Sequence, residues 1–338
     1  MLGKQSLQFV NKPYIIGSGS IVGSKEAAGP MGKLFDKVGY DDKFGADTWE
    51  DAESSLQKEA LEIALGKAGL KKKDLQLVFA GDLLGQSIAS SFGLSGYQLP
   101  HVGLYGACST CGLSLTMGSM AVAGGFVEKA ACITSSHFAS AEKEFRFPLA
   151  YGSQRPKSAT WTVTGSGAFL LSAQPGSQVR AVISGATVGR IVDYGLKDSM
   201  NMGACMAPAA ADTLRQHLED FGRQPDYYDK IITGDLGMVG QQLLFDLLAE
   251  AQIDITKQHM DCGIEIFDSE RQETNAGGSG CGCSAVVLSA YILKKLEEGV
   301  WNRVLFMPTG ALLSKTSFNE GQSIPGIAHG VVLEHYTG

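Results

Sequence analysis

The sequence predicts a layered α/β protein built from two copies of one β/α unit. Two motifs recur in the same order. One is an apolar strand that ends in Gly-Asp-Leu, at residues 77–83 and 231–236, and the other is a glycine- and cysteine-rich junction before a helix, at 106–112 and 277–283. Each copy supplies a mostly buried sheet with helices on its faces, and such layers stack to hide their apolar surfaces. We therefore expect a five-layer α/β/α/β/α fold. Chance similarity between glycine-rich turns is the alternative.

The first half begins with loops and then a helix with clear ends. Residues 1–50 contain one short apolar strand at 13–16 and many turn signals, which predicts extended segments that reach across another surface. Asp47 or Thr48 can cap the helix that follows, an apolar stripe runs along it, and Gly69 ends it.

Strands and helices then alternate. We expect buried strands at 75–80 and 130–134, because these runs are nearly all apolar, and a further strand at the apolar run 99–105. A helix that reaches Ser91 follows the first strand, and a helix over 113–122, rich in small residues, follows the second.

A long polar segment and two strands close the first half. Residues 135–162 have no clean period, so we expect a loop that caps a cleft. Strands are expected at 161–164 and 168–172, before a Gln-Pro-Gly-Ser break. The predicted domains are residues 1–174, which include the cap loop, and residues 175–338.

Composition excludes several classes of protein. The net charge of -7, with Lys71–Lys73 as the longest run of like charge, argues against a nucleic-acid surface or a polybasic membrane anchor. No clean apolar segment follows Lys4, so we expect no signal peptide, and no apolar run of about 18 residues predicts a membrane span. The 7 cysteines are expected to be reduced thiols in a soluble or peripheral protein.

Cys108 is the first candidate for chemistry. It lies where a strand turns into a helix, close to unpaired backbone N–H groups and the positive end of the helix dipole, which favour a thiolate or a bound anion. The alternative is that Cys108 is one more buried apolar side chain.

The duplication with a cysteine at the helix entrance of the first copy resembles the thiolase-like superfamily, which includes the ketoacyl synthases. The resemblance implies a thiolase-like fold over nearly the whole chain and puts Cys108 at the position of the acyl-carrying nucleophile. In that superfamily the cysteine works with downstream histidine, asparagine or cysteine side chains.

The partner side chains of that superfamily are missing from this chain. Its three corresponding loops read Thr233–Leu236, Ala276–Ser279 and Pro308–Gly310. An ionised Asp235 cannot donate to an oxyanion, and losing one such donor costs about 100-fold or more in rate. We therefore expect no condensing activity. A Cys108-dependent acyltransferase with an unusual base such as His137, or a purely structural subunit, remains the alternative.

More closely, the chain resembles the stage V sporulation protein AD family. The stretches that carry this resemblance are 81–84, 105–110, 134–137, 276–281 and above all the Met-Ala-Pro-Ala-Ala-Ala-Asp-Thr run at 206–213. The resemblance implies a protein that binds dipicolinic acid (pyridine-2,6-dicarboxylate), free or as its calcium chelate. It also implies action with the membrane proteins of the spore's dipicolinate transport complex, peripheral to the spore inner membrane, in uptake by the developing spore and release on germination.

A flat aromatic dianion needs an apolar slot with convergent N–H, hydroxyl and guanidinium donors. The predicted ligand-binding residues are Cys108, Ser135, Ser136, His137, Arg146, Arg155, Asp235 and Gly278. Each has a structural alternative: the serines can satisfy backbone groups at a strand end, the histidine can be a buried structural residue, and the arginines can lie on a solvated loop. Asp82 and Asp235 hold equivalent places, which favours a structural cap in both copies.

Cofactors and partners follow from the same interpretation. We expect no cofactor beyond Ca²⁺ brought by the ligand. Asp82 or Asp235 could complete the oxygen coordination shell of that ion. A zinc or redox site formed by Cys108, Cys111, Cys281 and Cys283 is a weaker alternative, because paired motifs with typical zinc spacing are absent from the sequence. A homodimer through the edge strand of the first copy is what the thiolase resemblance implies.

Overall fold

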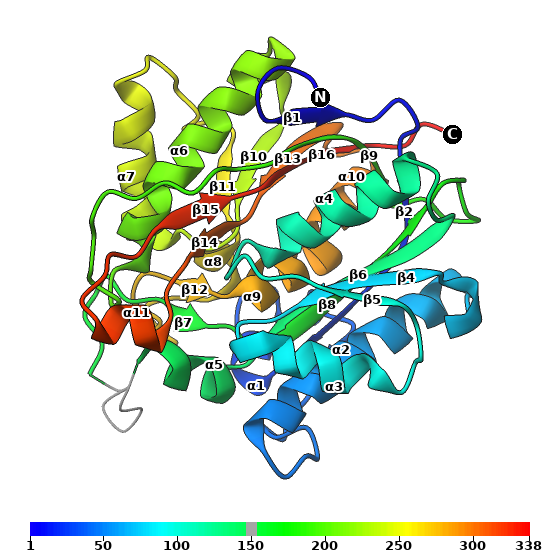
Figure 1. The fold of residues 1–338 in the computed structure, drawn as a ribbon, viewed down its shortest axis with the longest axis horizontal. Helices are drawn as coiled ribbons and strands as arrows, with labels where there is room; N and C mark the ends of the chain where they lie inside the picture. The colour runs from blue at the N-terminus through cyan, green and yellow to red at the C-terminus, as the bar shows by residue number, and fades with distance from the viewer. Residues whose placement is uncertain (147–153) are drawn as a thin grey trace.

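The computed structural model describes residues 1–146 and 154–338, in two sheets with the same strand order (Figure 1). The first sheet runs, in order, β5 (His101–Gly103), β4 (Leu77–Gly81), β6 (Lys129–Ser136), β8 (Gly165–Ser172) and β2 (Tyr14–Val22). The second runs β11 (His259–Asp261), β10 (Lys230–Thr233), β13 (Arg303–Met307), β16 (Gly330–Glu334) and β9 (Ala181–Thr187).

Strand directions repeat as well as strand order. In each sheet the first three strands are parallel, and the last two pair antiparallel. The sheets join where β2 pairs with β9, at Tyr14 with Val182 and Ile15 with Ala181. This repetition is what the duplicated Gly-Asp-Leu and Gly/Cys motifs predict.

Helices separate and cover the two sheets, so the molecule has five layers (Figure 1). The central layer holds α4 (Thr110–Ala123) and α9 (Cys281–Val287), which pack on each other and on strands of the sheets. The outer layers hold α2 (Trp49–Ala68) and α3 (Ile88–Ser95) on one side and α6 (Met202–Phe221) and α7 (Gly237–Ala249) on the other. The predicted fold class is therefore confirmed.

The local signals explain the helix ends. Thr48 accepts a hydrogen bond from the backbone N–H of Asp51 at the start of α2, and Gly69 ends the helix in the left-handed conformation (φ 65°). The helix α3 begins later than predicted, because Gln86 and Ser87 adopt positive φ angles and form a separate turn before it.

Short elements complete the description. The N-terminal β1 (Ser6–Gln8) pairs with β9, so the start of the chain crosses onto the second sheet, as predicted. The remaining helices are α1 (Ser24–Ala27), α5 (Phe138–Phe145), α8 (Cys262–Ile266), α10 (Leu293–Glu297) and α11 (Lys315–Asn319). The remaining strands are β3 (Lys37–Val38), β7 (Trp161–Thr162), β12 (Gly278–Ser279), β14 (Thr309–Ala311) and β15 (Gly326–Ala328).

The predicted cap segment is more ordered than its sequence indicates. It begins inside β6, continues as α5 and ends in β7, while residues 147–153 lie outside the described part of the chain. The division into domains at residue 174 stays a prediction. Among the described residues, every helix is too short or too polar to cross a bilayer.

Candidate functional site

Cys108 lies in a tight turn between β5 and α4, as the sequence predicts. The preceding Ala107 has φ 50°, a strained value for a residue with a side chain, and local hydrogen bonds hold the turn. The hydroxyl of Ser109 donates to the carbonyl of Gly106 (2.6 Å), and the N–H of Gly106 donates to Thr110 Oγ1 (3.0 Å). The side chain of Cys108 is buried in this turn, at the entrance to the central helix.

The thiol of Cys108 contacts the carboxyl group of Asp235. That carboxyl accepts the backbone N–H of Gly280 (3.0 Å), the hydroxyl of Thr309 (2.9 Å) and the thiol itself. Burial raises the pKa of Asp235 to about 7 in spite of these three donors. The pair is thus a thiol facing a buried carboxyl group.

The predicted preference of Cys108 for a thiolate is wrong. Burial raises the pKa of this thiol well above its usual value, and the negative charge of Asp235 raises it further. These two effects outweigh the backbone N–H of Gly280, which favours the thiolate. A thiol with a raised pKa is a poor nucleophile at neutral pH.

Two glycines let the later loops press against this turn. A Cβ atom on Gly310 would lie 2.3 Å from the carbonyl oxygen of Gly106 and 3.0 Å from the N–H nitrogen of Ser109. A Cβ atom on Gly280, which has φ 101°, would lie 2.6 Å from Ser136 Oγ. Glycine is therefore required where the second copy closes over Cys108.

Asp82 and Asp235 do not share one role, although their places in the two copies match. Asp82 accepts the N–H of Leu84 (2.9 Å) and both the N–H (2.8 Å) and the hydroxyl (2.6 Å) of Ser90, so it ties down the loop before α3. Asp235 faces Cys108, and Asp261 instead accepts the N–H groups of Leu236 and Gly237 before α7. The shared structural cap predicted for both copies is therefore wrong for Asp235.

Ser135 and Ser136 point into the protein. The Ser135 hydroxyl donates to Glu53 Oε1 (2.9 Å), and that of Ser136 donates to the carbonyl of Val163 (2.7 Å) and accepts the N–H of Gly282 (3.1 Å). Both hydroxyls thus have partners within the chain, which favours their structural interpretation.

His137 also has partners within the chain. Its Nδ1 accepts the N–H of Ala139 and so caps α5, which leaves the proton on Nε2 to donate to the carbonyl of Asp42 (2.8 Å). Burial lowers the pKa of His137, so the ring is neutral near pH 7.

Arg146 and Arg155 meet at one carboxylate on α5. Glu142 contacts Nη1 of both arginines and accepts the hydroxyl of Thr162 (2.9 Å). The side chain of Arg155 is 4% exposed, and its Nε and Nη2 have no hydrogen-bond partner among the residues that the structure describes. Those two nitrogens form the side of a guanidinium that pairs with a carboxylate in bidentate fashion.

Gly278 lies in β12, paired with Trp161 of β7. A Cβ atom there would meet the side chains of Ile266, Val163 and Phe267 at 2.8 to 3.2 Å, so apolar packing requires this glycine. Its predicted role in ligand binding stays a prediction, as do those of the other site residues.

The cysteines of the two junctions are directed to different partners. The thiol of Cys281 donates to the carbonyl of Ser135 (3.0 Å) and that of Cys283 to the carbonyl of Gly234 (3.6 Å). Within residues 1–146 and 154–338, histidine, cysteine and acidic side chains form no group of three or more suited to a metal ion.

A buried polar network that sequence reasoning missed lies behind the site. The Gln57 side-chain N–H₂ donates to the carbonyl of Gly81 (3.2 Å) and to the hydroxyls of Ser90 (2.8 Å) and Ser135 (2.9 Å), which in turn donate to Asp82 and Glu53. Burial and the charge of Asp82 raise the pKa of Glu53 to about 8. A glutamate and a glutamine on one face of an amphipathic helix are the signal that could have revealed this network.

A pocket of about 420 Å³, here called the mouth pocket, opens between the loop before α3 and the segment that leads into α11. It is lined by residues 83–87, Tyr105, Glu144, 312–315 and Ser317. Leu83 also packs in an apolar cluster with Cys108, Ala141 and Cys281, so the pocket reaches the surroundings of the thiol. Lys315 and Glu144 form an ion pair across its wall (3.4 Å).

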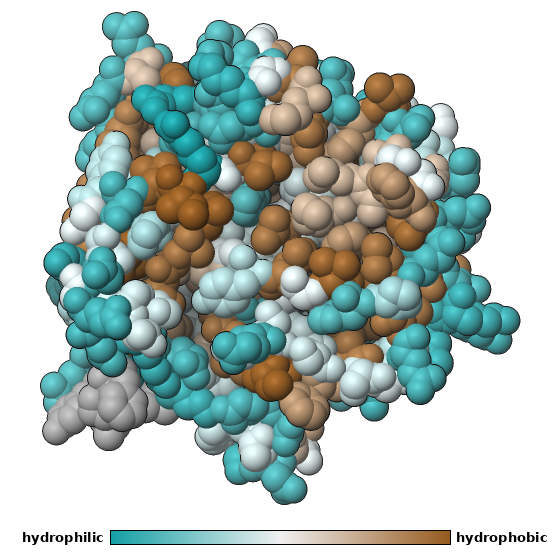
Figure 2. All heavy atoms as spheres, viewed as in Figure 1, coloured by the Kyte–Doolittle hydropathy of each residue, from teal (hydrophilic) through white to brown (hydrophobic). Residues whose placement is uncertain are grey.

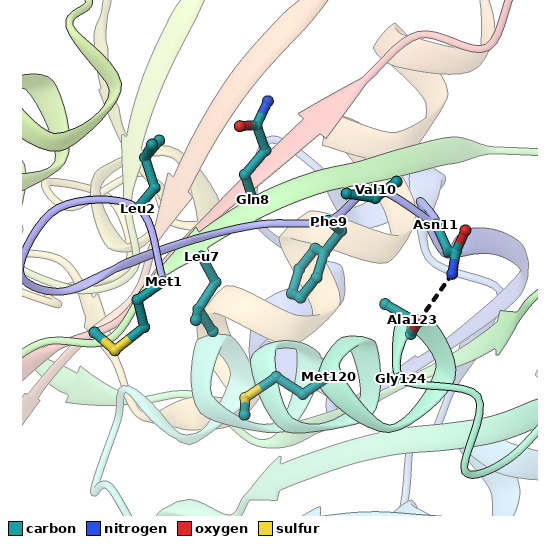
Figure 3. Close-up of a pocket in the computed structure, with 10 residues that line it drawn as sticks. All are labelled: Met1, Leu2, Leu7, Gln8, Phe9, Val10, Asn11, Met120, Ala123 and Gly124. Atoms are coloured by element: carbon teal, nitrogen blue, oxygen red, sulfur yellow. Dashed lines mark hydrogen bonds between the residues drawn. The ribbon is translucent and has the colours of Figure 1, made fainter.

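A second, more open recess of about 500 Å³ lies between the N-terminal segment and the end of α4 (Figure 3). Its wall is mostly apolar, with Leu7, Phe9 and Met120 among its side chains, and Asn11 donates to the carbonyl of Ala123 at its rim (3.3 Å). Every described side chain that lines this recess is uncharged, so it is poorly suited to a dianion.

Comparison with known proteins gives a family and a fold. The family model "Stage V sporulation protein AD (SpoVAD)" matches residues 3–334. Stage V sporulation protein AD of Bacillus subtilis (strain 168) is 44% identical over 339 residues, which covers 100% of this chain and 99% of the relative.

Solved structures of lower identity share the fold. The 3-oxoacyl-[acyl-carrier-protein] synthase III from Aquifex aeolicus VF5 matches with a TM-score of 0.57 and 15% identity, over 95% of this chain and 99% of that one. Human mitochondrial 3-ketoacyl-CoA thiolase matches with a TM-score of 0.60 and 11% identity, over 98% of this chain and 100% of that one. Both of these proteins are named as enzymes, whereas the name of the sporulation family states no reaction. On its full-length match to the family model and to the Bacillus relative, this chain belongs to the stage V sporulation protein AD family.

Proposed function

We propose that the chain binds dipicolinic acid, free or as its calcium chelate, and that it does so on a thiolase-like scaffold without condensing activity. The observation that carries the second half of the proposal is the contact between Cys108 and Asp235. A condensing enzyme needs a thiolate and a group that stabilises an enolate, whereas here a protonated thiol faces a carboxyl group.

The mouth pocket is the proposed site of the ligand. Its volume of about 420 Å³ lies within the usual range of small-molecule sites, about 300–1,000 Å³. Leu83 and Tyr105 offer apolar and aromatic surface, Ser87 and Ser314 offer hydroxyl donors, and Lys315 offers a positive charge for a carboxylate. A calcium ion in the chelate would find an oxygen ligand in Glu144. A purely structural subunit would fill such a cleft with side chains, so the open pocket argues against that alternative.

The surroundings of His137 favour binding over acyl transfer. Both ring nitrogens of His137, the base that an unusual acyltransferase would use, are engaged by backbone groups of the chain. The unpaired nitrogens of Arg155 have the geometry of a bidentate receptor for a carboxylate, but this side chain packs on Phe138 and Trp161 and does not line the mouth pocket.

Isothermal titration with dipicolinate, with and without Ca²⁺, tests the proposal. We expect saturable binding, weakened by about 10-fold or more in Lys315→Gln, since a hydrogen bond to a charged group contributes about 1.5–3 kcal/mol. The control is Lys294→Gln, which removes an exposed lysine from the far ion pair with Glu298 and should leave affinity unchanged. If millimolar dipicolinate gives no heat of binding with the folded protein, the binding function is excluded.

The enzymatic alternative has its own test. After incubation with acyl-CoA or acyl carrier protein, mass spectrometry should show unmodified Cys108. An acyl group on that residue would establish the acyltransferase instead.

The proposed partners are the proteins of the spore's dipicolinate transport complex at the inner membrane, and a second copy of this chain. The strand β5 ends the strand order of the first sheet, and Phe92 (64% exposed), Tyr105 (49%) and Met120 (41%) carry apolar surface on nearby elements. Figure 2 shows hydrophobic side chains gathered over the middle of this face and hydrophilic ones toward its rim. Sedimentation of the purified chain would show whether it is a dimer.

A further inference from the structure

A third cavity, of about 320 Å³, lies at the end of β2 and beside the start of α5. We call it the tryptophan chamber, because Trp49 from α2 and Trp161 from β7 form its walls together with Phe138, while Lys25, Glu26 and Asp42 supply its charged groups. Phe138 stacks on Trp161 with ring centres 4.1 Å apart, which fixes the position of that wall. The proposed binding of dipicolinate at the mouth pocket does not involve this chamber.

Glu26 places an unsatisfied oxygen in the chamber. The residue is 1% exposed, and its Oε1 accepts the backbone N–H of Thr164 (2.9 Å). Its Oε2 is buried and has no hydrogen-bond partner among the described residues. Leaving a buried polar atom unpaired costs about 1–3 kcal/mol, so such an atom calls for a partner that the chain itself does not supply.

A glycine keeps the space beside that oxygen open. Gly23 also lines the chamber, and a Cβ atom there would lie 3.0 Å from Glu26 Oε2. Its φ of -80° is one that any residue adopts, so backbone strain does not require glycine at this position. The missing side chain instead leaves room for an atom that approaches the carboxyl group.

The other polar groups of the chamber show which charge it would accept. The ammonium of Lys25 already donates to the carbonyl of Gln272 (2.7 Å) and lies 4.1 Å from the centre of the Trp161 ring. The ammonium of Lys43 lies 5.2 Å from the centre of the Trp49 ring. The guanidinium of Arg155 lies 4.9 Å from the centre of the Trp161 ring as well, so both indole rings already hold cations of the chain. The atom of the chamber that is left unsatisfied is the acceptor Glu26 Oε2.

We propose that the tryptophan chamber binds a primary ammonium group carried on a small flat apolar body, with Glu26 Oε2 accepting an N–H of the ligand. Burial raises the pKa of Glu26 to about 7, and the nearby charge of Asp42 adds to this effect, so Glu26 carries its full charge only above neutral pH and the titrations are made at pH 8.5. The aromatic walls of Trp49, Phe138 and Trp161 enclose the apolar body. A quaternary ammonium of the same shape has no N–H to donate and therefore binds more weakly.

Tryptophan fluorescence reads this chamber directly. The chain has 3 tryptophans, and the third, Trp301, packs against Tyr291 away from the chamber. In a Trp301→Phe background the emission therefore comes from Trp49 and Trp161. Titration with 2-phenylethylammonium should change this emission saturably, whereas benzoate and dipicolinate should not.

Two variants test the role of the carboxyl group. Glu26→Gln keeps an oxygen for the N–H of Thr164 but removes the charge, and affinity should fall about 10-fold or more. Gly23→Ala leaves Glu26 in place and crowds its Oε2, with a similar loss. The trimethylated ligand should bind about 10-fold more weakly than the primary amine. Because the probe is a cation and the readout is local, failure here leaves dipicolinate binding at the mouth pocket untouched, and the reverse also holds.

Three results would overturn the proposal. The first is an emission that does not change with 10 mM amine in the folded protein. The second is equal affinity in the parent chain and in Glu26→Gln or Gly23→Ala. The third is a saturable response to benzoate as strong as that to the amine, which would make the chamber an anion site.

Discussion

Replacing Asp235 by asparagine should make Cys108 more reactive. In the native chain the carboxyl group of Asp235 contacts the thiol, and its pKa of about 7 means that it carries a negative charge in most molecules at pH 8.5. This charge disfavours the thiolate, which is the reactive form of cysteine. The asparagine has nearly the same shape and no charge, so it removes the repulsion and keeps the packing.

The magnitude follows from Coulomb's law. Two unit charges about 4 Å apart interact by about 4 kcal/mol at an effective dielectric constant of about 20. The thiol is buried and the asparagine dipole replaces part of the field, so we expect one third to two thirds of that value, about 1.4–2.7 kcal/mol. This corresponds to a thiolate population, and hence an alkylation rate, that is about 10- to 100-fold higher.

The fold should survive this change. The asparagine oxygen can accept the N–H of Gly280, and the hydroxyl of Thr309 can turn to accept from the asparagine N–H₂ group, because a hydroxyl both donates and accepts. Labelling with iodoacetamide at pH 8.5, followed by mass spectrometry, measures the rate at Cys108. Cys111 provides the internal control, since it is fully buried, and Asp235 does not contribute to the raised pKa of about 12 that burial gives it.

The reasoning would be refuted by a folded Asp235→Asn protein whose Cys108 reacts within about twofold of the parent rate. That result would mean that burial alone, and not the carboxyl group, keeps the thiol unreactive. Faster labelling of Cys111 to the same extent would point to general loosening of the fold.

Two further predictions concern stability. Burial raises the pKa of Glu53 from 4.5 to about 8, so the folded chain holds a proton that the unfolded chain releases, and stability falls as the pH rises from about 4.5 to about 8. The drop in melting temperature between pH 6.5 and pH 8.5 should therefore be smaller in Glu53→Gln than in the parent, and an equal drop would count against the buried proton. Gly310→Ala should cost about 2 kcal/mol or more in urea unfolding, because its Cβ would meet the carbonyl of Gly106 at 2.3 Å. Gly96→Ala, with open space around the Cβ, is the matched control, and equal midpoints for both variants would contradict the close packing of the loop.

Most of the fold could be predicted because its signals are local and occur twice. The apolar strands at 75–80 and 130–134 and the capped helix between Thr48 and Gly69 depend on neighbouring residues, and the structure has them as β4, β6 and α2. The repeated order of such signals gives the duplication, and two stacked copies give the layers. The late start of α3 was missed because it depends on the unusual backbone of Gln86 and Ser87.

The candidate site could be predicted only in outline. The junction at Cys108 and the carboxyl group of Asp235 in a loop that lacks the superfamily's partner side chains are visible in the sequence. The contact between them depends on packing between the two copies, where Thr309 and Gly280 hold the carboxyl group. Equivalent positions in a duplicated chain therefore predict that both residues follow the end of a corresponding strand. They do not predict which groups each side chain contacts.

The polar residues of the segment after β6 illustrate the same limit. Ser135 has its partner Glu53 far back along the chain, and Arg146 pairs with Glu142 on α5. A polar residue that follows a buried strand suggests a ligand when its partners lie far away in sequence. Only the packed structure shows that the hydroxyl of Ser135 is already satisfied, whereas Nε of Arg146 is left without a partner among the described residues.

A crystal of the chain soaked with dipicolinate tests the central claim most directly. The account predicts electron density for a ring with two carboxylates in the mouth pocket, in contact with Lys315 and Leu83, and an unmodified thiol at Cys108. Density for the ligand in another cavity alone, or an empty mouth pocket at a saturating concentration of ligand, would contradict it.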